Sequence, residues 1–160
     1  MSRFGAPSPK LIIEKIANND AGTTSVDLSA NALFTMKTFE YCGLLAEALK
    51  KNTVVTEITL GKLGITDPDV ELIAGALAVN QTITTVNLDG NKLGSDGAVH
   101  IANGLKTNSS VTHIVLLNNG AFGETCLEVR TVSPSASVVC RVSSSVGIDN
   151  CRTVYDRAVV

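Results

Sequence analysis

The feature that most constrains the fold of this chain is an internal repeat of 28 residues. Three stretches that begin at Val55, Ile83 and Val111 align without a gap, so that apolar and polar residues fall in the same columns. Self-similarity at a fixed period is the signature of a chain built from stacked units. The same spacing separates three asparagines, at Asn52, Asn80 and Asn108.

Each repeat combines two periodicities. Residues 83–88 alternate apolar and polar side chains, which is typical of a strand with one buried face. Apolar residues at 70, 73, 74 and 77 follow the spacing of one helix face. Asp67 is a candidate N-cap for that helix, and Pro68 fits its first turn. The pattern predicts one strand followed by one helix in every unit.

An earlier copy of the strand pattern lies at Val26 and Leu28. Val26 precedes Ile58 by 32 residues, so the first unit carries four extra residues between its strand and its helix. Four residues fit either a longer loop or one more helical turn.

A strand and a helix of this length cannot bury their apolar faces alone, so neighbouring units must share one core. The sequence therefore predicts an α/β fold, a right-handed leucine-rich-repeat solenoid of about three to four repeats of 28 residues. Its parallel strands would line the concave face and its helices the convex face. The consensus asparagine after the strand is present at Asn31 and Asn91, whereas Leu63 replaces it in the second unit. Because that asparagine satisfies backbone groups where the chain turns, Leu63 predicts a locally different turn.

Three segments carry a resemblance to a known family: residues 18–20 (NND), residues 23–28 (TTSVDL) and residues 46–55 (AEALKKNTVV). Units of 28 residues with a full helix resemble the ribonuclease-inhibitor-like class of leucine-rich repeats, and the three segments more closely resemble the repeat domain of tropomodulin and leiomodin. The resemblance spans about residues 10–119. It implies a short helix at residues 11–17 that covers the open end of the solenoid, and it implies actin as a partner.

The chain divides into three parts: an N-terminal segment with the capping helix (residues 1–22), the leucine-rich repeats (23–119) and a C-terminal tail (120–160). The tail lacks the repeat and is rich in Ser and Val. One hypothesis makes it a divergent cap with an extra strand at residues 138–142. The other makes it a poorly ordered segment, for example one that arose when the reading frame shifted after a truncated repeat array.

The 160 residues include 13 basic and 15 acidic ones, and this balance argues against nucleic acid or an anionic membrane as a partner. The N-terminus lacks the apolar stretch of a signal peptide, so we expect a cytoplasmic location. Nucleotide-binding loops, zinc-protease motifs and paired metal-ligand cysteines are absent from the sequence. We therefore expect no catalysis, no cofactor, no metal and no small-molecule substrate. Cys42 falls in an apolar helical column and is expected in the core.

Outward positions of the strands are the candidate binding surface, because solenoid proteins bind partners there. Asp27, Glu57 and Asp89 make this surface mildly acidic, which favours a basic partner. Outward apolar residues at its far end predict a partner, the tail folding over them, or a tendency to aggregate. The candidate contact residues are Asp27, Glu57, Thr59, Thr85, Asn87, Asp89, His113, Val115 and Leu117.

Three functional hypotheses follow from the sequence. The first is a non-catalytic module that binds another, unidentified protein through the concave strand face. The second, implied by the resemblance, is a tropomodulin-like regulator that binds the pointed end of actin filaments. The third is a truncated repeat array without an independent function.

Overall fold

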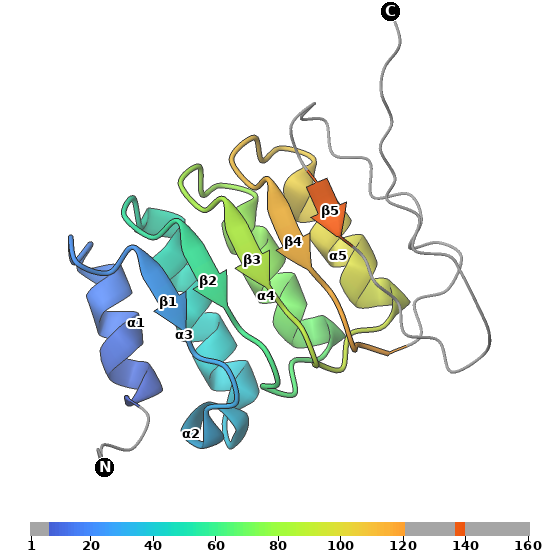
Figure 1. Cartoon of the computed structure of the whole chain (residues 1–160), viewed down its shortest axis with the longest axis horizontal. Helices are drawn as coiled ribbons and strands as arrows, with labels where there is room; N and C mark the ends of the chain where they lie inside the picture. Colours follow the sequence, from blue (N-terminus) through green and yellow to red (C-terminus); the bar gives the residue numbers. More distant parts are fainter. Residues whose placement is uncertain (1–6, 121–136, 140–160) are drawn as a thin grey trace, which may run out of the picture.

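A computed structural model describes residues 7–120 and 137–139 as a mixed α/β fold (Figure 1). Its strands form one parallel sheet in the chain order β1-β2-β3-β4-β5, and helices α1, α3, α4 and α5 lie behind this sheet in Figure 1. The elements are α1 (Pro9–Ala17), β1 (Ser25–Asp27), α2 (Ala32–Thr35), α3 (Thr38–Lys51), β2 (Glu57–Thr59), α4 (Asp67–Leu77), β3 (Thr85–Asn87), α5 (Ser95–Leu105), β4 (His113–Val115) and β5 (Ser137–Val139).

The strand register is the one that the repeat spacing predicts. Ile58 pairs with Val86 and Val86 pairs with Ile114, so equivalent residues of the 28-residue units lie side by side. Val26 pairs with Ile58 across the longer spacing of the first unit. All four side chains are buried, and they form the inward row of the sheet.

Helix α4 shows why each unit turns where it does. Thr66, not Asp67, is the N-cap residue, so the predicted cap position is wrong by one residue. The carboxylate of Asp69 accepts hydrogen bonds from the Thr66 backbone N–H at 2.8 Å and from its hydroxyl at 2.6 Å. Asp67 instead accepts a hydrogen bond from the backbone N–H of Gly94 at 2.7 Å, which ties one unit to the next.

A ladder of buried asparagines joins the units before strands β2, β3 and β4. Nδ2 of Asn80 donates to the carbonyls of Leu49 and Asn52, 2.8 and 3.0 Å away. Its Oδ1 accepts from the backbone N–H groups of Thr82 and Ile83. Asn108 makes the same four bonds one unit later, whereas Asn52 accepts from Val54 and Val55 but donates to the Ile16 carbonyl alone. The ladder satisfies backbone groups that would otherwise be buried without partners.

A second ladder lies after the strands, where the consensus asparagine stands. Asn91 donates through Nδ2 to the carbonyls of Leu60 and Leu88, and its Oδ1 accepts from Leu63 and Ile65 of the preceding unit. Leu63 has no side-chain amide and is buried, so this ladder stops at the second unit.

The turn that carries Leu63 differs from its counterparts, as the sequence predicts. The residue before the consensus position has a positive φ in every unit, but here Gly64 adds a second positive φ of 72°.

The four extra residues of the first unit form a separate short helix, α2, rather than an extension of the following helix. Asn31 caps it, with Oδ1 accepting from the N–H groups of Leu33 and Phe34, each at 3.1 Å. Phe34 is fully buried and stacks on Tyr41 at a ring-centroid distance of 5.3 Å. This aromatic contact fixes α2 at the lower edge of the sheet in Figure 1.

Helix α1 occupies the β1 end of the fold and covers the helical segment 11–17 expected from the resemblance. Ile13 and Ile16 are buried, and Nδ2 of Asn52 donates to the Ile16 carbonyl at 2.7 Å. Within the described ranges, no helix has both the length and the apolar character needed to cross a membrane.

At the other end, β5 pairs in parallel with β4. It includes Val138 and Val139 of the extra strand that the cap hypothesis places at 138–142, whereas residues 140–142 lie outside the described residues.

Candidate protein-binding surface

The sheet brings the predicted contact residues together in rows across its outward face. The first row consists of Ser25, Glu57, Thr85 and His113, which pair in register across β1 to β4. The second row consists of Asp27, Thr59, Asn87 and Val115, which pair in the same way. A third row follows the strands at Ser29, Gly61, Asp89 and Leu117. Side chains of these rows point away from the helices, because strand residues alternate between the two faces of a sheet.

The β1–β2 end of this face is acidic and open. Asp27 and Glu57 are both exposed. Oδ1 of Asp27 accepts from the backbone N–H of Ser29 at 2.8 Å, and Ser25 donates through its hydroxyl to Glu57 at 3.4 Å. Two carboxylates on one rigid sheet offer a preformed contact for basic groups of a partner.

The centre of the face is polar and half-buried. Asn87 accepts from the backbone N–H of Asp89 at 2.9 Å, and Asp89 accepts from Nδ2 of Asn118 at 2.8 Å. Thr59 and Thr85 stand beside them at half-buried positions. These hydrogen bonds restrict the side chains of Asn87 and Asp89 to one orientation.

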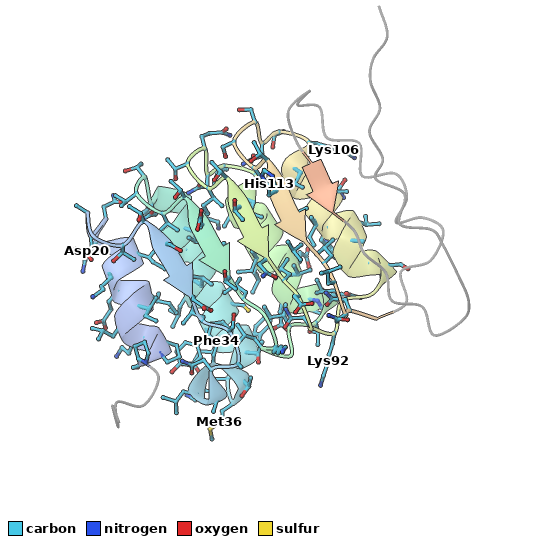
Figure 2. All side chains as sticks on the ribbon, viewed as in Figure 1. Asp20, Phe34, Met36, Lys92, Lys106 and His113 are labelled. Carbon is cyan, nitrogen blue, oxygen red and sulfur yellow. The ribbon has the colours of Figure 1, made fainter. Side chains whose placement is uncertain are left out.

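The β4 end of the face is apolar. Val115 and Leu117 are half-buried and stand outward, as the sequence predicts, and Val139 occupies the register position opposite Val115. His113 is exposed, and its Nδ1 lies 2.9 Å from the hydroxyl of Thr112 (Figure 2). The face thus changes from acidic to apolar across four strands.

Two observations on the described residues concern metal binding and thiol chemistry. No group of three or more His, Cys, Asp or Glu side chains lies close enough to hold a metal ion within the ranges that the structure describes. Cys42 is fully buried, and its burial together with the Asp69 carboxylate raises the pKa of the thiol to about 12. A thiol in that state is not a nucleophile at neutral pH.

Three exposed apolar side chains at and directly after the four-residue insertion were not predicted from the sequence. Leu33, Met36 and Phe39 are all exposed, although they flank the buried Phe34. Leu33 lies in α2, Met36 follows its last residue and Phe39 lies in the first turn of α3, so the periodicity of a single helix gave no signal for them.

Comparisons with known proteins assign the chain to a family. The sequence model of the TMOD/LMOD leucine-rich domain matches residues 9–160. A solved structure of Leiomodin-1 Actin-Binding Site 2 is similar over 83% of this chain and 79% of that chain, with 28% identity and a TM-score of 0.71. The tropomodulin C-terminal domain of Caenorhabditis elegans is similar over 87% of this chain and 86% of that chain, with a TM-score of 0.73. Its 13% identity supports the fold alone.

No curated protein sequence matches the chain. The family match continues past Gly120, through the segment in which the sequence shows no repeat. The suspected resemblance to the tropomodulin and leiomodin repeat domain is confirmed, and the chain belongs to the TMOD/LMOD leucine-rich domain family.

Proposed function

We propose that this chain is a non-catalytic protein-binding module whose partner is actin. The observation that carries the proposal is the similarity, at 28% identity over 83% of this chain, to a structure named as an actin-binding site of leiomodin-1. The proposal therefore favours the second hypothesis from the sequence. The first hypothesis, binding of an unidentified protein, is its more general form. In its finer form, the chain acts at filament pointed ends in the cytoplasm.

The proposed contact is the outward sheet face. Asp27 and Glu57 supply exposed negative charge at one end, while Val115 and Leu117 supply apolar surface at the other. Because rigid backbone pairing holds both ends, little conformational entropy is lost when a partner binds. A complementary partner surface would carry basic groups beside an apolar patch.

The proposed architecture is a right-handed solenoid of three to four repeats with the strands on its concave side. The 28-residue register of β2, β3 and β4 supports this architecture. We also retain the division into residues 1–22, 23–119 and 120–160, in which the repeats form the binding part.

Co-sedimentation with actin filaments at low salt tests the proposal. The variant Asp27→Lys/Glu57→Lys reverses both charges at the acidic end, and Glu14→Lys/Glu71→Lys makes the same charge change at exposed positions on α1 and α4. We expect the first variant to bind about tenfold more weakly than the unmodified chain and the second to bind normally.

Pyrene-actin elongation at pointed ends tests the finer form, for which we expect slower elongation. If the unmodified chain neither sediments with filaments nor changes elongation, actin is not its partner. If both charge variants lose binding equally, the sheet face is not the contact.

A further inference from the structure

The strongest unassigned feature is the apolar surface of the insertion in the first unit. Among the described residues seven large apolar side chains are exposed, and three of them fall within residues 33–39. Met36 is 80% exposed, Phe39 63% and Leu33 50%. We call these three side chains the insertion patch. Apolar side chains gathered in this way mark an interaction site more often than scattered ones do.

The insertion patch stands on a rigid base. Phe34 is buried below it, and Asn31 both caps α2 and donates through Nδ2 to the Pro7 carbonyl at 3.1 Å. On the other side, the Thr38 hydroxyl donates to the Leu63 carbonyl at 3.2 Å. These bonds fix the residues on either side of α2, with Asn31 tied to Pro7 before α1 and Thr38 tied to Leu63 of the second unit, so the exposed side chains between them are presented in a fixed arrangement.

Lysines continue the same edge of the sheet. Lys62 directly precedes Leu63, and the hydrogen bond from Thr38 to the Leu63 carbonyl places this turn beside the start of α3. Lys92 lies in the next turn, where its backbone N–H donates to the Ile65 carbonyl at 2.8 Å. Figure 2 shows the Met36 and Lys92 side chains projecting from this edge, away from the sheet. Both lysines are exposed, and neither forms an ion pair within the described part of the chain.

We propose that the insertion patch is a second contact surface, which enters an apolar hollow on a protein partner while Lys62 and Lys92 meet acidic groups at its rim. The patch protrudes, so the partner must supply the hollow; the unpaired lysines require an acidic rim. This inference rests on the proposed function, in which the partner is actin. A membrane fits less well, because recognition of anionic lipid uses clusters of about four to eight basic residues. Two unpaired lysines on a chain of net charge −2 fall short of that.

The test is co-sedimentation of the full chain with actin filaments. The variant Met36→Glu/Phe39→Glu places charge in the insertion patch, and Leu44→Glu/Val79→Glu places the same charge at apolar positions that are 47% and 59% exposed on the helical side. We expect the patch variant to raise the dissociation constant about tenfold or more, with the helix variant unchanged. A Met36→Ser/Phe39→Ser variant should weaken binding as well, since it removes apolar area without adding charge. Circular dichroism melts verify that all three variants fold.

The outcomes separate the two claims. Normal binding by the patch variants, beside binding by the unmodified chain, overturns the inference and leaves the proposed function standing. Failure of the unmodified chain to bind actin removes both. Vesicles of phosphatidylcholine with phosphatidylserine form a further arm: sedimentation with them that the patch variants lose would assign the patch to a membrane and refute the protein contact.

Discussion

The first unit and the two 28-residue units that follow it satisfy the same backbone groups in different ways. In the second unit, the N–H of Ile65 donates to Asn91 of the next unit. In the first unit, the corresponding turn donates from Leu33 and Phe34 to Asn31 of the same unit. The regular units therefore hold one another, whereas the turn of the first unit holds itself.

This difference explains where an insertion can occur. A turn that bonds to its neighbour must keep the neighbour's spacing, because a change in length would leave buried backbone groups without partners. Leu63 provides no amide to the first unit, so the turn after β1 is free of that requirement. Four extra residues are accommodated there, and they expose the insertion patch. The interrupted ladder and the candidate contact surface thus have one structural cause.

The largest expected effect comes from breaking one rung in each kind of turn. Asn91→Ala removes four hydrogen bonds to backbone groups, three of them to Leu60, Leu63 and Ile65 of the second unit, and we expect it to lower the free energy of unfolding by about 3 kcal/mol. Asn31→Ala removes the cap of α2 together with the bond to the Pro7 carbonyl, but no bond to the second unit, and should cost about 1 kcal/mol. Urea unfolding of both variants measures the two losses. Equal losses would show that self-contained and shared bonds stabilise the fold alike.

Two helical glycines extend the comparison from turns to helix packing. A Cβ at Gly104 would lie 2.5 Å from the carbonyl oxygen of Ala74 in the neighbouring helix, whereas at Gly43 its nearest neighbour would be Cδ1 of Leu72 at 4.0 Å. Gly104→Ala should lower the free energy of unfolding by about 2 kcal/mol, since α4 and α5 must separate.

Gly43→Ala is the matched change in the first unit, and it should raise the free energy of unfolding by about 0.5 kcal/mol because alanine favours the helix. A stabilising effect at Gly104 would contradict the close packing of the regular units.

The regular part of the fold was predictable from the sequence because equal spacing puts equivalent residues at equivalent places. The pairing of Ile58 with Val86 and the burial of Cys42 follow directly from the repeat columns. The rows of the outward face could be placed by the same argument.

Contacts between loops were not predictable, because they depend on distances between units that spacing alone does not set. Asp67 is the clearest case, since its carboxylate bonds to Gly94 of the next unit rather than capping its own helix. The exposure of Met36 and Phe39 was missed for a related reason: an insertion has no counterpart in the other units from which its orientation can be inferred.

A smaller effect concerns the core of the first unit. Burial raises the pKa of the Cys42 thiol from an ordinary value of 9.0 to about 12. Because the folded value lies above the unfolded one, the protonated thiol favours the folded state fully below pH 9 and loses this advantage as pH rises toward 12. Above pH 9, we expect the free energy of unfolding of the unmodified chain to fall by about 1 kcal/mol per pH unit relative to that of Cys42→Val, which cannot ionise at this position. Urea unfolding at pH 8 and pH 10 gives the difference; parallel pH profiles would mean that the first-unit core is open to water.

The smallest effect is expected at the exposed ion pairs of the first unit. Lys37 and Glu40 lie 3.0 Å apart at the start of α3, next to the insertion, and hydrogen bonding to Glu40 raises the pKa of Lys37. Exposed pairs of this kind contribute little, because water screens them and ordering two long side chains costs entropy. If Phe34 and Asn31 hold α2, Lys37→Ala should leave the urea midpoint unchanged, and 1 M sodium chloride should not alter it either. Glu47→Ala, which removes the pair with Lys50 at the far end of α3, is the control. A loss at Lys37 comparable with that of Asn31→Ala would show that surface charge, rather than the buried ring and the cap, fixes the insertion.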